Sequence, residues 1–260
     1  MHRSRVLAAM ALIAVPTAAL AHSPYLAPNL FDLNKRDHVT VTGSFTEVFL
    51  EPDIVMKSNA YAVVGPDGTR TPLTPTYLSD LAVVEAKTPT NGTYRITTGP
   101  REGRVAKAYF AKGEWTFLEE PNAPAPAGAT AVDMQSLTTA DVYVSRGAPN
   151  DAALAPTGKG LEFKAITHPN SVFVGKDAVF QALYDGKPLA DLPVEIHQAD
   201  GRYGDGKPPT SATTGADGRF SVKASRAGLY HIMSRYRLPP APGTTLAKSY
   251  TYALTFEATD

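Results

Sequence analysis

The stretch Val39-Thr-Val-Thr-Gly-Ser-Phe-Thr46 alternates apolar and polar residues, and it decides the fold class of this chain. Side chains of a β-strand point in turn to opposite faces, so a period of two predicts a half-buried strand. The same alternation returns much later, in Val194-Glu-Ile-His-Gln198. These two stretches predict short strands in both halves of the chain.

The segments around these stretches also consist of short strands separated by turn sequences. Residues 60–64 form an apolar run that stops at Gly65-Pro66-Asp67-Gly68, a strong turn sequence. Residues 178–184 form another, which stops at Asp185-Gly186. Some helical character is confined to residues 81–87 and 131–139, and both segments are short. We therefore predict an all-β protein.

A weak similarity between two segments of the sequence indicates two domains. Asn91-Gly-Thr-Tyr-Arg-Ile96 is similar to Ala227-Gly-Leu-Tyr-His-Ile232, and a Gly-x-Tyr element often marks a turn into a late strand of a sandwich. Coincidence between two strands is the alternative interpretation. We predict two tandem immunoglobulin-like β-sandwiches, at residues 22–120 and 159–260. A Pro/Ala-rich linker with one candidate strand would occupy residues 121–158.

The first 21 residues have the pattern of a secretory signal peptide. A basic start at residues 1–5 precedes the apolar run 6–15, and Ala19-Leu20-Ala21 matches a cleavage site. The apolar run is too short to span a bilayer, which takes about 20 residues. We expect export to a bacterial periplasm, no membrane-spanning segment in the mature protein, and His22 as the new N-terminus.

Composition excludes several classes of function. The 25 Lys and Arg residues balance 25 Asp and Glu residues, which argues against nucleic-acid binding and against electrostatic membrane binding. The chain has no cysteine, so disulfides, thiolate metal sites and cysteine nucleophiles are excluded. Any metal ion must be held by histidine, carboxylate, amide or backbone groups.

The order of several motifs resembles a known exported family. The motifs are Gly160–Asn170, Phe180–Ala190, Thr213–Phe220 and Arg226-Ala-Gly-Leu-Tyr230. In this order they are similar to the family called domain of unknown function 4198, which is associated with periplasmic components of nickel/cobalt uptake. The start of the mature chain, Ala-His-Ser-Pro-Tyr-Leu, is similar as well, so the resemblance covers essentially the whole mature chain. It implies metal handling, with a membrane metal transporter or an outer-membrane receptor as partner.

This chain departs from the family pattern in two respects. It lacks the long acidic or histidine-rich loops of some metal chaperones, and Ser23-Pro24 follows the histidine where other members commonly have acidic or aromatic residues.

His22 is the strongest candidate for a metal ligand. After cleavage, its α-amine and its imidazole Nδ1 can chelate one ion together, and a free amine titrates near 7.7–8.0, so it loses its proton readily. Nitrogen ligands favour Cu²⁺ and Ni²⁺. The alternative is that His22 is only a consequence of where cleavage falls. One residue cannot complete a site.

The other predicted metal ligands are His168, His197 and His231, with Glu47, Glu51, Asp53 and Glu195 as candidate carboxylate partners. We assign His197 to the strand face opposite Glu195, and we expect His38 to be solvated. A lone histidine on a strand is more often a packed or surface residue than a ligand. Because no H-x-H, H-x-x-x-H or H-E-x-x-H spacing occurs, any site must be assembled across the fold.

The chain has no motif typical of an enzyme. It lacks a Gly-x-Ser-x-Gly elbow and a phosphate-binding loop. We expect a non-enzymatic periplasmic accessory protein that binds a transition metal (nickel, cobalt or copper) for uptake. The alternative is a carbohydrate-binding or protein-interaction β-sandwich module. Its stacking residues would be Tyr203, Tyr230, Tyr236, Tyr250 and Tyr252.

Overall fold

The computed structural model describes residues 22–118, 120, 122–199 and 210–260. Apart from one 3-10 turn, η1 (Ala152–Leu154), every regular element among these residues is a β-strand, so the all-β prediction is confirmed. The predicted signal peptide lies outside the described residues. None of the helical structure in the described part of the chain is long and apolar enough to cross a membrane.

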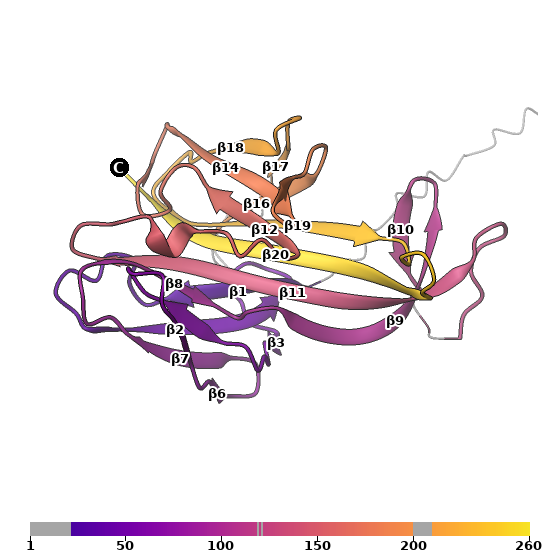
Figure 1. The fold of residues 1–260 in the computed structure, drawn as a ribbon, viewed down its shortest axis with the longest axis horizontal. Coiled ribbons are helices and arrows are strands. Elements are labelled where there is room, and N and C mark those ends of the chain that lie inside the picture. The colour runs from indigo at the N-terminus through magenta and orange to yellow at the C-terminus, as the bar shows by residue number, and fades with distance from the viewer. Residues whose placement is uncertain (1–21, 119, 121, 200–209) are drawn as a thin grey trace, which may run out of the picture.

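The strands form three sheets stacked in layers (Figure 1). The N-terminal sheet A lies on one side of a long central sheet B, and sheet C lies on the other side. Sheet A contains β1 (Ser23–Pro28), β2 (His38–Thr46), β3 (Ile54–Val55), β6 (Thr76–Tyr77) and β7 (Ala82–Lys87). Sheet C contains β12 (Leu161–Ala165), β14 (Asp177–Tyr184), β15 (Lys187–Pro188) and β18 (Arg219–Lys223).

The central sheet takes strands from both halves of the chain. Its main order is β17-β16-β19-β20-β11-β8-β4-β5. The N-terminal half supplies β4 (Ala62–Val64), β5 (Arg70–Pro72), β8 (Gly92–Thr97), β9 (Arg101–Ala111) and β10 (Glu114–Phe117). The remaining strands are β11 (Ala131–Arg146), β13 (Val172–Phe173), β16 (Pro193–Gln198), β17 (Thr210–Thr213), β19 (Gly228–Leu238) and β20 (Leu246–Thr259).

The segment predicted as a linker contains the strand that joins the halves. β11 runs parallel to β20, from Asp133 opposite Leu246 to Val142 opposite Thr255. Its other edge is antiparallel to β8 and β9. The two halves therefore share one continuous sheet, while the predicted domain boundaries at residues 120 and 159 stay a prediction.

Alternation along the central strands divides their side chains between two hydrophobic cores. On β19, Tyr230 and Ile232 face the core shared with sheet C, whereas Met233 faces the core shared with sheet A. On β11, Tyr143 and Val144 divide in the same way. A sheet covered on both faces needs apolar residues at both alternating positions. The predicted pair of β-sandwiches is confirmed, with sheet B as a layer of each.

The two segments with weak helical character are strands. Residues 82–87 form β7 and residues 131–139 lie within β11. Burial on β7 alternates strictly, with Ala82, Val84 and Ala86 inside. This period of two, together with pairing to β2, decides against a helix.

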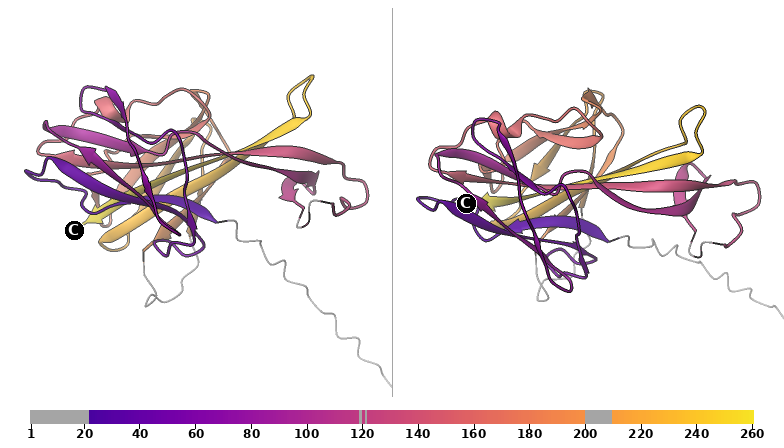
Figure 2. Two further views of the ribbon diagram at one scale, coloured as in Figure 1. Left: turned by 90° about the horizontal axis from the view of Figure 1, so that it is seen from below. Right: turned by 60° about the horizontal axis from the view of Figure 1, so that its bottom comes forward.

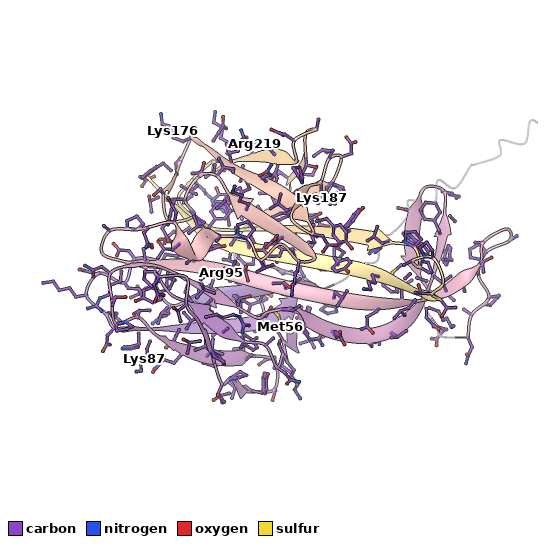
Figure 3. The ribbon with its side chains drawn as sticks, viewed as in Figure 1. Met56, Lys87, Arg95, Lys176, Lys187 and Arg219 are labelled. Carbon is purple, nitrogen blue, oxygen red and sulfur yellow. The ribbon has the colours of Figure 1, made fainter. Side chains whose placement is uncertain are left out.

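A buried ion pair ties the central strands together. Arg95 of β8 and Asp141 of β11 are almost fully buried, with 4.0 Å between Nε and Oδ2. The Tyr252 hydroxyl of β20 donates a hydrogen bond of 2.6 Å to Asp141 Oδ2. Figure 3 shows Arg95 near the middle of the molecule, whereas Lys87, Lys176, Lys187 and Arg219 lie toward the periphery. Removing one partner of such a pair costs about 3–5 kcal/mol.

An arm extends from the central sheet beyond sheets A and C (Figures 1 and 2). It consists of the β9–β10 hairpin, the first half of β11 and the hairpin that joins β19 to β20. A small cluster around Ala108, Met134 and Ala247, covered by Trp115 and Phe117, packs within it.

Candidate functional site

Strand β1 brings residues 22–28 to the central sheet. It pairs with β2 along its whole length, from Ser23 opposite Thr46 to Pro28 opposite Val41. It also packs against β11 and β20. The Pro24 carbonyl accepts a hydrogen bond of 2.9 Å from His231 Nε2. Proline suits this position because it has no N–H that would need a partner on the same side.

His231 of β19 is the buried centre of the site. Its side chain is 1% exposed, and its Nε2 lies 2.9 Å from the Pro24 carbonyl oxygen. A carbonyl can only accept, so Nε2 carries the proton and Nδ1 keeps a lone pair. Nδ1 is buried and has no hydrogen-bond partner among the described residues. Burial, with the nearby His197, lowers the pKa of His231 to about 3, so the ring is neutral.

The loop at residues 47–53 covers His231. The Phe49 ring packs on the imidazole with 5.0 Å between centroids. The buried Thr46 hydroxyl lies against the carbonyls of Val48 and Glu51, between which its one hydrogen is shared, and so shapes this loop. Asp53 accepts a hydrogen bond of 2.7 Å from the Glu47 amide. The loop thereby holds an aromatic ring on His231 and places Glu47 beside His22.

His197 lies directly across the strand pair from His231. The two residues are opposite each other on β16 and β19, with 5.6 Å between ring centroids. His197 Nε2 is 3.4 Å from Glu195 Oε2. This hydrogen bond, together with the charge of Arg235, lowers the pKa of Glu195 against the opposing effect of burial. Our assignment of these residues to opposite faces is therefore wrong, because residues two apart on a strand share a face.

His22 completes the group at the start of β1. Its Nε2 is 3.7 Å from Glu47 Oε1, and its carbonyl oxygen is 3.4 Å from the Arg235 guanidinium. The structure thus brings together His197 and His231, two of the four predicted ligands, whereas the described contacts of His22 are with Glu47 and Arg235. In each of the three histidines Nε2 faces an oxygen atom, of Glu47 for His22, of Glu195 for His197 and of Pro24 for His231.

His168, the fourth predicted ligand, belongs to a different network. Its Nδ1 accepts a hydrogen bond of 3.1 Å from the Asn170 amide. Its Nε2 faces the Thr93 hydroxyl at 3.0 Å and the Asn150 carbonyl at 3.3 Å. Both ring nitrogens are therefore engaged, in contacts that join the 167–171 loop to β8. The structure does not bring His168 to the other three histidines.

The described side chains do not form a ready-made metal site. No three His, Asp or Glu side chains in the described ranges are grouped so that they could already hold an ion. His38 pairs with Asp37 at 2.9 Å on the surface. Glu51 and Asp53 belong to the loop at 47–53, where Asp53 accepts a hydrogen bond from the Glu47 amide. A complete site here needs a ligand beyond the side chains, and an N-terminal amine at His22 would be one.

The predicted tyrosine surface is not supported. Tyr230 and Tyr252 are buried in the core shared with sheet C. Tyr236 and Tyr250 pack against Tyr184, with 5.1 and 5.3 Å between ring centroids. Tyr203 lies outside the described residues. The described tyrosines of the predicted set are thus divided between the core and its rim.

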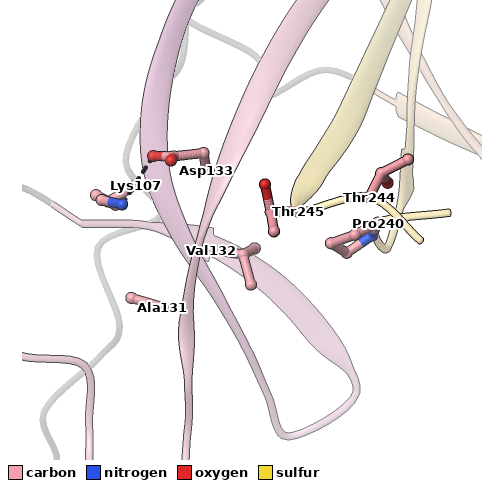
Figure 4. Close-up of a pocket in the computed structure, with 7 residues that line it drawn as sticks. All are labelled: Lys107, Ala131, Val132, Asp133, Pro240, Thr244 and Thr245. Carbon is pink, nitrogen blue, oxygen red and sulfur yellow. Dashed lines mark ion pairs between the residues drawn. The ribbon is translucent and has the colours of Figure 1, made fainter. Parts of the chain in front are cut away.

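Two cavities among the described residues have no histidine in their lining. The larger, of about 370 Å³, is an open hollow on the arm beside the ion pair of Lys107 and Asp133, which are 2.9 Å apart (Figure 4). The other, of about 220 Å³, is lined by Asp32, Glu257 and Asn170 among others. Burial and the charge of Asp32 raise the pKa of Glu257.

A family model matches residues 19–238, which is most of the chain. The chain belongs to this family, described as Domain of unknown function (DUF4198). The family resemblance inferred from the motifs is therefore confirmed. The DUF4198 match includes His22, Glu195, His197, His231 and Arg235, so the whole histidine site lies within the family region.

Comparison with solved structures gives only distant similarity. The D0-D1 domain of intimin is 12% identical over 89% of this chain and 96% of that chain, with a TM-score of 0.22. The adhesin InvE of Yersinia pseudotuberculosis is 13% identical over 90% of this chain and 58% of that chain, with a TM-score of 0.20. These scores support no conclusion about function. No curated protein matches this DUF4198 chain.

Proposed function

We propose that this protein is a periplasmic accessory protein that binds a transition-metal ion (nickel, cobalt or copper) for uptake. The observation that carries the proposal is the Nδ1 atom of His231, which is buried, neutral and without a hydrogen-bond partner. A histidine that ligates a metal almost always donates its other ring N–H to a carbonyl or carboxylate. His231 does so to Pro24, and His197 does so to Glu195.

The proposed ligands are the α-amine and Nδ1 of His22 with Nδ1 of His197 and of His231. All four are nitrogen atoms, which suit Cu²⁺ and Ni²⁺ better than hard cations such as Mg²⁺ or Ca²⁺. The amine exists only after cleavage before His22, so binding would follow export. His168 is not part of this set, because both of its ring nitrogens are already engaged.

The proposed activity is binding and release, without a chemical step. Glu47 and Glu195 supply negative charge near the ion, and both lie beside ligand histidines. The ion would be the cargo of the protein, passed to a membrane metal transporter or received from an outer-membrane receptor. The signal-peptide pattern supports this location.

Calorimetric titration of Ni²⁺, Co²⁺ and Cu²⁺ into the mature protein tests the proposal. The matched control is the same protein with one alanine added before His22, which replaces the free amine by an amide. We expect tight binding of at least one ion by the authentic protein and much weaker binding by the extended one. Equal binding by both would remove the terminus from the site, and binding by neither would overturn the metal proposal.

A further inference from the structure

The exposed apolar side chains are concentrated in two parts of the fold. Among the described residues nine large apolar side chains are exposed, and four of them lie at one end of sheet A. These four are Val48, Ile54, Tyr77 and Leu78, with exposed fractions of 53%, 50%, 38% and 53%. Three more lie in the arm, where Phe110 is the most exposed at 52%. Single exposed apolar residues are normal, whereas a group of them indicates an interaction surface.

Backbone contacts bring the exposed residues of sheet A to one surface. The buried Ser44 hydroxyl lies 2.9 Å from the Ile54 carbonyl oxygen and 2.7 Å from the Asp80 carbonyl oxygen. Strand β3 therefore adjoins the turn between β6 and β7. A hydrogen bond of 2.8 Å from the Leu78 amide to the Leu81 carbonyl closes that turn. We call this surface the acidic patch; it consists of Val48, Ile54, Tyr77 and Leu78 with Asp53 and Asp80.

Negative charge surrounds the apolar side chains of the acidic patch. Residues 47–57 and 78–81 include four acidic residues and one basic residue. Burial raises the pKa of Tyr25 to about 12, and the charges of Asp80 and Asp53 add to this effect. The two carboxylates therefore lie near the same ring. A partner for this surface needs an apolar group with positive charge beside it.

The tip of the arm has these two properties. Lys112 and Gly113 form its turn with φ values of 53° and 87°, and two positive values are typical of a type I′ hairpin turn. Phe110 lies opposite Trp115, with 5.4 Å between ring centroids. Trp115 packs on the small cluster of the arm, whereas about half of Phe110 stays exposed. Residues 104–117 include three basic residues and one acidic residue.

We propose that the tip of the arm docks on the acidic patch of a second copy of this chain. The two surfaces have opposite charge, with a net charge of −3 for residues 47–57 and 78–81 and of +2 for residues 104–117. The arm carries its tip away from sheet A of the same molecule (Figures 1 and 2), so the patch that it meets belongs to another copy. Phe110 is the apolar anchor of this contact, and Lys112 supplies the charge that faces the carboxylates.

Each copy has one tip and one acidic patch, so two copies can dock reciprocally. Reciprocal docking closes a dimer about a two-fold axis and covers both patches, and two-fold dimers are the commonest closed oligomers. The inference goes beyond metal binding and does not depend on it, because no proposed metal ligand belongs to either surface.

Sedimentation velocity of the mature protein over a range of concentrations tests the contact. Phe110→Ser and Leu78→Ser each remove an apolar side chain from one of the two surfaces. The matched control is Phe173→Ser, because Phe173 is 47% exposed but lies on β13, outside both surfaces. Charge is tested with Lys112→Glu, with Asp80→Lys, and with the protein that carries both changes. Circular dichroism establishes that each variant is folded.

We expect a wild-type dimer that dissociates on dilution. Phe110→Ser and Leu78→Ser should each weaken it by about tenfold or more, whereas Phe173→Ser should leave it unchanged. Each charge reversal should weaken the dimer, and the two together should restore it, because the facing charges are again opposite.

A wild-type monomer at every concentration would overturn the proposal, as would a dimer that Phe110→Ser leaves intact. Monomers that bind phospholipid vesicles through Phe110 would also overturn it and would assign the tip to a lipid surface. If Phe110→Ser does not fold, Lys112→Glu is judged by the same measurement.

Discussion

His168 and His231 occupy contrasting environments in the same protein. His168 is held at both ring nitrogens, by the Asn170 amide on one side and by Thr93 and Asn150 on the other. His231 is more deeply buried, yet only its Nε2 has a partner, the Pro24 carbonyl. The two rings therefore differ in whether one ring nitrogen lacks a hydrogen-bond partner, although burial lowers the pKa of both.

The difference separates a supporting histidine from a candidate ligand. A buried polar atom without a partner costs about 1–3 kcal/mol, and each such atom in a native protein calls for a physical reason. His168 has no such atom, and its contacts explain it fully as a connection between a loop and β8. For His231, a metal ion at Nδ1 is the reason we propose. The predictions that follow test whether the two histidines differ in this way.

The largest effect is expected from His231→Gln. The glutamine amide can still donate to the Pro24 carbonyl, but it offers no imidazole nitrogen to an ion. We expect Cu²⁺ affinity to fall by more than about 100-fold, which is beyond the range typical of an outer-shell partner. Calorimetry measures the affinity, and circular dichroism confirms that the variant is folded. A folded variant with wild-type affinity would place His231 in the same structural class as His168.

The next effect, on stability, is expected from His168→Ala. The change leaves Thr93, the Asn170 amide and the Asn150 carbonyl without their ring partner. We expect the free energy of unfolding to fall by about 2 kcal/mol, because three hydrogen-bond contacts are lost and polar groups are left unsatisfied. Urea denaturation measures this loss, and Cu²⁺ affinity should not change. Lost affinity with unchanged stability would reverse the roles assigned to the two histidines.

The smallest effect concerns pH and the apo-protein. The pKa of His231 is lowered from 6.5 to about 3, so below pH 6.5 the unfolded chain binds a proton that the folded chain does not. Stability should therefore fall as the pH drops from 6.5 toward 3, by about 1 kcal/mol at pH 5.5 for this residue. Denaturation of wild type and His231→Gln at pH 7 and pH 5.5 measures the difference. An equal fall in both proteins would show that His231 does not contribute.

Much of the fold could be predicted from local pattern. The alternation in residues 39–46 and 194–198 corresponds to β2 and β16, because period-two burial is a property of each strand by itself. The strand at 131–146 was harder to predict, because both of its faces are buried and its sequence lacks a clean alternation. That β11 and β20 pair in parallel depends on the path of the whole chain.

The site could be predicted only in part. The candidates Glu47 and Glu195 do lie beside His22 and His197, and the face shared by Glu195 and His197 follows from strand period alone. The pairing of His197 with His231 depends on the register of two strands that are distant in sequence. The packing of Phe49 depends on a loop in which Leu50 adopts a φ of 72°, a conformation that no pattern indicates.

Anomalous diffraction from crystals of the mature protein loaded with Cu²⁺ tests the central claim most directly. We predict one strong peak bonded to the His22 amine and to the Nδ1 atoms of His22, His197 and His231, with His168 unchanged. A peak at His168 or His38, or bonds through Nε2 of the three site histidines, would contradict the account.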